Sequence, residues 1–418
     1  MTHVSTATEL AAASGLSTHV DAVMAAEQVC ESVGQGLGSA RPDLALLFVS
    51  DRHVSKFNDV AAEVRRALDP GTLLGVSSNG VVGPDTEVEN QPAVSLLALT
   101  LPNTTLHPFL YADLPFVGDE DPAALEKTAR VIGAERDLRA VMFFGDPFSV
   151  PVNPLADALS RCHAAVPGLK RVPVIGGMAS GARSPGANVI ALNDRTMRAQ
   201  GAGITVRGRV SVDTLVSQGC RPIGKPLVIT DGARNAVRKL AGRAALEVLR
   251  ETIDALPERD RELVSSSGVF VGRVINEYKD RFGRGDFLIR AIVGIDRNSG
   301  ALGVNDNVRV GQTVQFHLRD ANTAGEDLRL LLDAQKLQTP PVGSLLITCN
   351  GRGESLFKER HHDARTVSSA LSFKHDEPMP MAGFFAAGEI GPIGDRSFVH
   401  GFTSVLAMFR PARQDPTG

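Results

Sequence analysis

Residues 381–394 read MAGFFAAGEIGPIG, a short apolar run followed by a Gly-x4-Gly-x3-Pro frame. The same frame occurs twice earlier, in GVSSNGVVGP at 75–84 and in GGMASGARSP at 176–185. Apolar runs typical of strands precede and follow each frame, so the repeating unit is strand, helix, strand, glycine loop, strand. An internal repeat of this kind decides the architecture of a chain. Glycine at two fixed offsets predicts positive φ or close approach to another group. Ordinary tight turns are the alternative.

The repeat favours a mixed α/β fold made of two pseudo-equivalent halves. At 418 residues the chain exceeds the usual size of one core, which indicates two domains. We expect a loose leader over 1–19, an N-terminal domain over 20–224 and a C-terminal domain over 225–412. In the second domain, apolar spacing over 233–256 predicts a long helix.

Composition excludes several classes of function. A net charge of −3, no Trp and only two Tyr argue against a nucleic-acid binder. The four cysteines, Cys30, Cys162, Cys220 and Cys349, are too dispersed for a disulfide framework or a zinc site. Reduced thiols, no signal peptide and no run long enough to span a bilayer predict a cytoplasmic protein without membrane attachment.

No metal or cofactor is expected. His361, His362 and Asp363 are consecutive, and adjacent histidines in a helix point about 100° apart, which does not favour a shared ion. The glycine frame also lacks the spacing of the nucleotide-phosphate motifs.

Several stretches resemble the FIST family of sensory domains. They are GCRPIG at 219–224, LITCNGRG at 346–353, GFFAAGEIGPIG at 383–394 and VHGFTSVLAMF at 399–409. GVSSNGVVG at 75–83 is similar to the family's N-terminal signature, Gly-Cys-Ser-x-x-Gly-Glu, except that Val76 replaces its Cys and Val81 its Glu. The resemblance implies an intracellular module thought to bind small ligands such as amino acids. Because the chain ends at Gly418 without an output domain, we expect its signal to pass through a separate signalling protein or a homo-oligomer.

The strongest site candidates are Arg352 and Glu389. Arg352 lies in a glycine-flanked segment directly after a strand, where ligands bind in open α/β sheets, and its guanidinium can hold a carboxylate. Glu389 lies among Ala and Gly with few polar neighbours, so it needs a partner or a raised pKa. We expect it to receive an ammonium group. The alternatives are that Arg352 pairs with a local acid and that Glu389 holds its own turn.

Other candidate residues lie in or near the glycine loops or carry a thiol. The serines and asparagine of the first loop offer neutral hydrogen bonds, although such residues more often make turns. Cys220 is followed by Arg221, a cation that could lower the pKa of the thiol and activate it, although a structural cysteine is the alternative. The further ligand-binding candidates are Ser77, Ser78, Asn79, Cys220, Arg221, Cys349, Asn350, Gly351, Gly353 and Gly388.

These observations favour a non-enzymatic protein that binds an amino acid or small carboxylate in a cleft lined by the glycine loops. Ligand would shift the relative orientation of the halves, and a partner would detect that change. One alternative is a thiol-dependent enzyme using Cys349, for which His375 and His400 are the nearby candidate bases. Another is a protein-interaction adaptor without a ligand.

Overall fold

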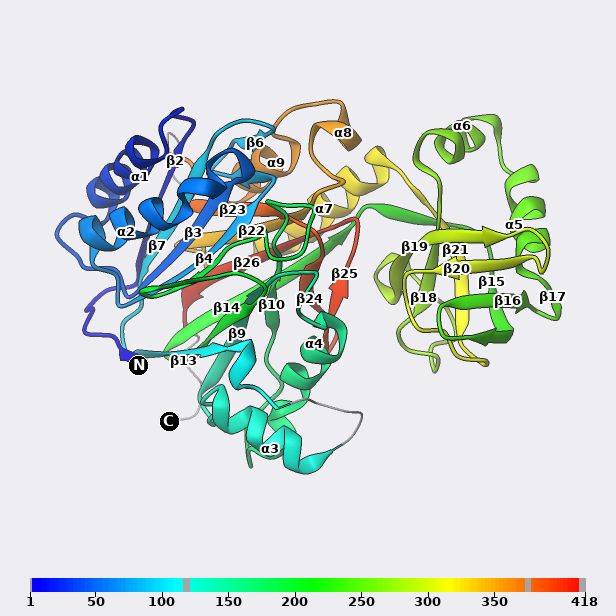
Figure 1. Cartoon of the computed structure of the whole chain (residues 1–418), viewed down its shortest axis with the longest axis horizontal. Coiled ribbons are helices and arrows are strands. Elements are labelled where there is room, and N and C mark those ends of the chain that lie inside the picture. The colour runs from blue at the N-terminus through cyan, green and yellow to red at the C-terminus, as the bar shows by residue number, and fades with distance from the viewer. Residues whose placement is uncertain (1, 116–120, 373–376, 413–418) are drawn as a thin grey trace. The chain divides into compact units, whose positions relative to one another are not determined.

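The computed structural model describes residues 2–115, 121–372 and 377–412, and it confirms a mixed α/β fold with several sheets. The chain forms two compact units, and Figure 1 labels many of their elements. Unit 1 comprises Met1–Val216, Leu328–Val399 and Thr403–Gly418, and unit 2 comprises Ser217–Asp327 and His400–Phe402. These units do not coincide with the consecutive halves expected from the sequence, because the chain leaves unit 1 and later returns to it.

The described part of unit 1 contains three sheets. The first has the order β12 (Arg195–Met197), β11 (Ile190–Leu192), β4 (Thr72–Ser78), β3 (Leu44–Ser50), β7 (Val94–Thr100) and β2 (Ala11–Ser17). The second runs β1 (His3–Val4), β8 (Thr104–Leu110), β13 (Gly201–Gly208), β9 (Leu138–Gly145), β10 (Val174–Met178), β24 (Glu389–Ile393) and β25 (Arg396–His400). The third runs β14 (Val210–Gln218), β26 (Thr403–Pro411), β22 (Gly343–Cys349), β23 (Met381–Ala386), β5 (Gly80–Val82) and β6 (Glu87–Glu89).

Each sheet contains one copy of the repeated unit. The two strands before each glycine loop are parallel neighbours: β3 with β4, β9 with β10, and β22 with β23. The strand that completes each unit pairs antiparallel with the first one, as β7, β13 and β26 do. A short strand after each glycine loop then joins a different sheet: β5 pairs with β23, β24 with β10, and β11 with β4. The three units therefore exchange strands in a closed cycle.

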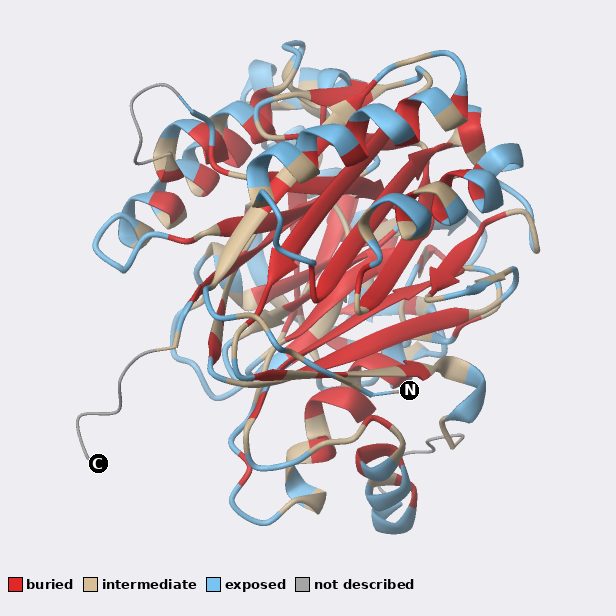
Figure 2. Cartoon of the chain, turned by 90° about the vertical axis from the view of Figure 1, so that its left-hand side faces the viewer, coloured by how far each residue is buried: buried red, intermediate tan, exposed pale blue. Residues whose placement is uncertain are grey.

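Helices lie on the outer face of each sheet, and Figure 2 shows their outward sides exposed over buried strands. Their apolar residues pack in separate clusters, one for each sheet. The first sheet carries α1 (Ala22–Leu37) and α2 (Phe57–Leu68), the second α3 (Pro122–Val131) and α4 (Val152–Arg161), and the third α7 (Ala321–Gln335) and α9 (His362–Leu371). The four-residue helix α8 (Glu354–Phe357) precedes α9, and 3₁₀ turns cover Asp51–Lys56, Tyr111–Asp113 and Cys162–Ala165.

The inner faces of the three sheets share one core. On β3, Leu46 and Phe48 point into it, whereas Leu47 and Val49 pack under α1 and α2. This alternation explains why the run is continuously apolar: both faces of the strand are buried. At the centre, the rings of Phe48, Phe144 and Phe384 lie 5.3–5.8 Å apart, centroid to centroid.

The first glycine is required by close strand packing in two of the three frames. A Cβ at Gly383 would lie 1.7 Å from the Leu346 carbonyl oxygen, and one at Gly176 would lie 1.8 Å from the Phe143 oxygen. At Gly75 the corresponding distance, to the Leu47 oxygen, is 3.1 Å. Close approach, one of the two expected reasons for glycine, is therefore confirmed at Gly383.

Unit 2 is a sheet of antiparallel strands with two helices of its own and the first part of α7. The order is β15 (Cys220–Ala233), β21 (Thr313–Arg319), β18 (Val269–Val274), β19 (Phe287–Asp296), β20 (Ala301–Val304), β16 (Ala236–Leu240) and β17 (Arg243–Ala244). Helices α5 (Ala245–Asp254) and α6 (Glu258–Ser267) accompany the sheet, and a 3₁₀ turn covers Arg284–Asp286. Residues of α5 share a core with β15, β16, β18, β20 and β21.

Two sequence-based predictions of local structure are wrong. The helix expected over 233–256 begins only at Ala245, because β15 turns back through β16 at Arg234 and a second reversal follows at Ala241, both with positive φ. The leader expected over 1–19 is not loose, because β2 (Ala11–Ser17) pairs with β7 along its whole length. Its small residues resemble a linker in composition, but they suit close packing against α1, where a Cβ at Gly15 would lie 2.7 Å from the Val29 oxygen.

None of the helices within residues 2–115, 121–372 and 377–412 combines the length and the apolar character that a bilayer-crossing segment requires.

Candidate functional site

The three glycine loops meet within unit 1. The N–H groups of Ser180 and Gly181 in the second loop donate to the Ser77 carbonyl in the first, at 3.2 and 3.3 Å. The Met178 N–H donates to the Gly388 carbonyl in the third loop at 2.9 Å. These contacts follow from the strand exchange, since each loop leads the chain from one sheet to another.

Arg352 is fully buried beside this junction and forms a two-point ion pair with Asp363. Its Nε donates to Oδ2 of Asp363 at 2.6 Å and its Nη2 to Oδ1 at 2.9 Å, and the Thr348 hydroxyl also donates to Oδ2. Burial raises the pKa of the Asp363 carboxyl, but the Arg352 charge and hydrogen bonds from Arg352 and His362 outweigh it and hold that pKa below its ordinary value. The third guanidinium nitrogen, Nη1, is buried and has no hydrogen-bond partner among the described residues.

Glu389 is also fully buried, at the start of β24. Its Oε2 accepts hydrogen bonds from the Thr403 hydroxyl at 2.8 Å and the Thr403 N–H at 3.2 Å. Its Oε1 has no N–H or O–H donor within the described part of the chain, and the Cys349 thiol lies within hydrogen-bonding range of the carboxyl group. Burial raises the pKa of Glu389 to about 8, although Thr403, Cys349 and Arg352 each oppose the shift.

A third carboxyl group, Glu87 on β6, faces the start of α9. Its Oε1 accepts the Ala364 N–H at 3.2 Å, and its Oε2 is buried without a partner among the described residues. Burial and the neighbouring charge of Asp363 raise the pKa of Glu87 to about 8. We call Glu87, Cys349, Arg352, Asp363 and Glu389 the loop cluster.

The residues just before Arg352 lie closer to solvent than the rest of the loop cluster. Cys349 is half-buried and Asn350 is exposed. With its amide oriented to donate, Asn350 reaches Asn79 Oδ1 in the first loop at 2.9 Å, and its backbone N–H donates to the Ala386 carbonyl. Gly353 has a φ of 63°, and a Cβ there would lie 2.3 Å from a Glu89 carboxylate oxygen. Gly351 donates its N–H to the Cys349 sulfur at 3.5 Å.

The serines of the first loop are engaged in local hydrogen bonds. Ser77 Oγ accepts the Val189 N–H at 2.9 Å, and Ser78 Oγ donates to the Gly80 carbonyl at 2.8 Å. Both side chains are buried. Val76 and Val81, which replace the polar signature residues, lie in the central core. The first loop therefore contributes Asn79 to the rim of the cluster.

Cys220 and Arg221 belong to unit 2. Cys220 is buried among Phe270, Phe287 and other apolar side chains. Arg221 pairs with Asp260 at 2.5 Å and with Asp320 at 2.9 Å, which gives it a structural role in that unit.

The alternative that Arg352 pairs with a local acid is confirmed, but the sequence analysis did not identify that acid as Asp363, and it missed Glu87. Asp363 stands eleven residues after Arg352 at the start of a helix, and its charge was the only available signal. Nothing in the sequence around Glu87 indicated a place in the site, because its position depends on β5 and β6 joining the third sheet. Of the candidate bases for Cys349, His375 lies outside the described residues and His400 belongs to unit 2. His361 accepts the Glu87 N–H, and no metal-binding group of His, Cys, Asp and Glu occurs among the described residues.

The raised pKa of Glu389 predicts a pH dependence of stability. Between about pH 4.5 and pH 8 the unfolded chain releases this proton while the folded chain retains it, so the folding constant should fall by about tenfold per pH unit on account of Glu389. The Glu389→Gln variant mimics the neutral form and should lose less stability than the wild type between pH 5 and pH 8. Urea denaturation at each pH measures the difference, with the exposed Glu359→Gln as control. Parallel stability curves for Glu389→Gln and wild type would contradict the prediction.

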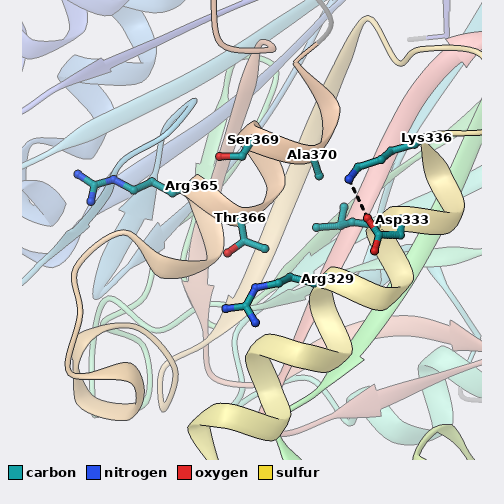
Figure 3. Close-up of a pocket in the computed structure, with 8 residues that line it drawn as sticks. Arg329, Asp333, Lys336, Arg365, Thr366, Ser369 and Ala370 are labelled. Atoms are coloured by element: carbon teal, nitrogen blue, oxygen red, sulfur yellow. Dashed lines mark hydrogen bonds and ion pairs between the residues drawn. The ribbon is translucent and has the colours of Figure 1, made fainter.

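A separate pocket of about 360 Å³ lies between α7 and α9 (Figure 3). The Lys336 ammonium pairs with Asp333 there at 2.7 Å. None of the residues expected from the sequence to bind ligand lines this pocket, whose walls are Arg329, Leu332, Asp333, Lys336, Arg365, Thr366, Ser369 and Ala370. It is one alternative location for a ligand in unit 1.

Comparison with known proteins matches most of the chain to two domain families. Residues 43–243 match the FIST N domain and residues 245–392 match the FIST C domain. An uncharacterized protein of Mycobacterium tuberculosis is 39% identical over 399 residues, covering 94% of this chain and 98% of the relative. One of Mycobacterium bovis is 36% identical over 398 residues, covering 94% and 97%. A solved cyanuric acid hydrolase from A. caulinodans aligns with a TM-score of 0.34 and 9% identity over 97% of this chain and all of that one, which is too low to assign a shared fold.

Proposed function

The chain belongs to the FIST family, whose domains are generally thought to be small-ligand sensory domains in signalling, and we propose that it senses a small molecule at the loop cluster of unit 1. The proposal places the ligand where the three glycine loops meet. It concerns binding, and it assigns no catalytic residue.

One observation carries the proposal. The loop cluster contains a guanidinium nitrogen, Arg352 Nη1, and two carboxyl oxygens, Glu389 Oε1 and Glu87 Oε2, that are buried without N–H, O–H or acceptor partners among the described residues. An unsatisfied buried polar group costs about 1–3 kcal/mol, so native proteins rarely retain one without a bound water or ligand. Among these atoms, Arg352 Nη1 and Glu389 Oε1 have opposite character, and together they favour a ligand that carries both an acceptor and a donor.

An amino acid or a related small carboxylate fits this pair. Its carboxylate would accept from Arg352 Nη1, and its ammonium would donate to Glu389 Oε1. Because Asp363 already occupies the other two guanidinium nitrogens, Arg352 would bind the ligand through one nitrogen and not in a two-point grip. Asn79, Asn350 and the backbone amides of Gly351, Gly353 and Gly388 would complete the rim.

The signal would then pass through α9. Asp363 pairs with Arg352, and the Ala364 N–H bonds to Glu87, so a ligand that draws Arg352 toward itself acts directly on the first turn of this helix. We propose that a separate signalling protein or a second copy of the chain detects the change. A cytoplasmic location is part of the proposal, since the four cysteines form no disulfide.

Thermal unfolding in the presence of amino acids and small carboxylates tests the proposal. A ligand at a hundredfold excess over its Kd should stabilise the protein by about 2.7 kcal/mol. Ammonium binding requires Glu389 to release its proton, so affinity for an amino acid should rise as the pH increases from 6 toward 8. Glu389→Gln should weaken the binding of amino acids by about tenfold or more, and that of simple carboxylates less.

A matched control uses the pocket between α7 and α9. Arg329→Gln removes a cation from that pocket and leaves the loop cluster intact. If Arg329→Gln abolishes stabilisation while Glu389→Gln does not, the ligand binds in the pocket and the proposed site is wrong. If no amino acid or carboxylate stabilises the wild type, the proposed ligand class is wrong.

A further inference from the structure

The four cysteines differ sharply in access to solvent. Cys30, Cys162 and Cys220 have exposed fractions of 5%, 1% and 0%, and burial raises the pKa of Cys30 and Cys162 to about 12. Cys349 is half-buried at the last position of β22. Small reagents in solution can therefore reach one of the four thiols far more readily than the others.

The groups around Cys349 are suited to removing its proton. The Glu389 carboxyl lies within hydrogen-bonding range of the thiol, and its Oε1 has no N–H or O–H donor among the described residues. Arg352 contributes a buried cation close enough to interact with both groups, and its Nη1 has no hydrogen-bond partner among the described residues. The Gly351 N–H points to the sulfur at 3.5 Å. A nearby cation and a backbone N–H both stabilise a thiolate.

We propose that Cys349 is a site of reversible oxidation by hydrogen peroxide or a small organic peroxide, in which Glu389 transfers the thiol proton. The Glu389 carboxylate takes the proton from sulfur, and the thiolate attacks one peroxide oxygen. The S–O bond forms as the O–O bond breaks, and the departing oxygen takes the proton back from Glu389. Sulfur is oxidised to the sulfenic acid, and the peroxide is reduced to water or an alcohol.

The geometry supports this role for Glu389 rather than for another acid. Glu87 and Asp363 also lie in the loop cluster, but Glu87 faces the backbone of α9 and Asp363 is held by Arg352 at two points. Cys349 and Arg352 both interact with the Glu389 carboxyl. A carboxyl whose pKa lies near the working pH is well placed both to accept and to return a proton. The inference does not depend on a ligand occupying the cluster.

The test is the rate of sulfenic acid formation at each cysteine. The protein is treated with hydrogen peroxide at pH 7.5 and trapped with a dimedone probe, and modified peptides are quantified by mass spectrometry. Cys349 in the urea-unfolded wild type, at the same pH, supplies the reference rate. In the folded wild type we expect Cys349 to react at least about tenfold faster than this reference. Cys30, Cys162 and Cys220 should remain unmodified, and dithiothreitol should restore the Cys349 thiol.

Two further measurements assign the proton transfer. Glu389→Gln should lower the Cys349 rate at least about tenfold, with circular dichroism confirming the fold. In the wild type the rate should rise with pH and level off above about pH 8, where Glu389 is ionised. The inference is overturned if folded Cys349 reacts no faster than the unfolded reference, or if Glu389→Gln leaves the rate unchanged. Either result is obtained without ligand, so it is independent of the sensory proposal.

Discussion

Asp363→Asn should destabilise the protein by about 3–5 kcal/mol, because it leaves the fully buried guanidinium of Arg352 without its charge partner. The substitution keeps the shape of the side chain and removes only the charge and one acceptor oxygen. Urea denaturation of the wild type and the variant at pH 7 measures the loss. The effect should be large because the pair lies in the interior, where water cannot replace the missing carboxylate.

Two control variants separate the charge effect from ordinary substitution. Asp333→Asn breaks the exposed ion pair with Lys336 and should cost at most about 1 kcal/mol. The double substitution Arg352→Met with Asp363→Leu should recover most of the loss, because it removes both charges together. A change of less than about 1 kcal/mol in Asp363→Asn would show that the ion pair does not hold this part of unit 1.

Gly383→Ala should cost about 3 kcal/mol or more, or prevent folding. The new Cβ would lie 1.7 Å from the Leu346 oxygen, and both strands are buried in the centre of the third sheet. Overpacking in a core costs about 1–3 kcal/mol when side chains can adjust. Here the obstacle is a backbone carbonyl, which cannot move without breaking the pairing of β22 with β23.

The other glycines provide a graded series for the same measurement. Gly75→Ala should cost less, since its Cβ would lie 3.1 Å from the Leu47 oxygen. Gly34→Ala should stabilise the protein by about 0.5–1 kcal/mol, because Gly34 lies inside α1 with no atom within 4 Å of its Cβ position. If Gly383→Ala and Gly75→Ala cost the same, the explanation by close strand approach is wrong.

The repeated glycine frame revealed the architecture because its cause is local. At Gly176 and Gly383 the two parallel strands leave no room for a Cβ, and at Gly75 a Cβ would make a tight contact with the neighbouring strand, so the same local packing favours glycine in each unit. Strands buried on both faces, such as β3, could also be predicted, because their continuous apolar runs are visible in the sequence without knowledge of the neighbouring strands. The same reasoning failed over 233–256, where helical apolar spacing coincided with a strand pair and a short helix.

The partners within the candidate site were beyond this kind of reasoning. Arg352 and Glu389 could be selected from their own neighbours in sequence, but Asp363 and Glu87 reach Arg352 only after α9 has packed against the third sheet and β6 has joined that sheet. The loops meet because each unit passes a strand to a different sheet, and that pairing depends on contacts hundreds of residues apart. Short-range chemistry therefore identified the elements and the charged residues, whereas burial, which sets their pairing and their pKa values, arose only from the assembled sheets.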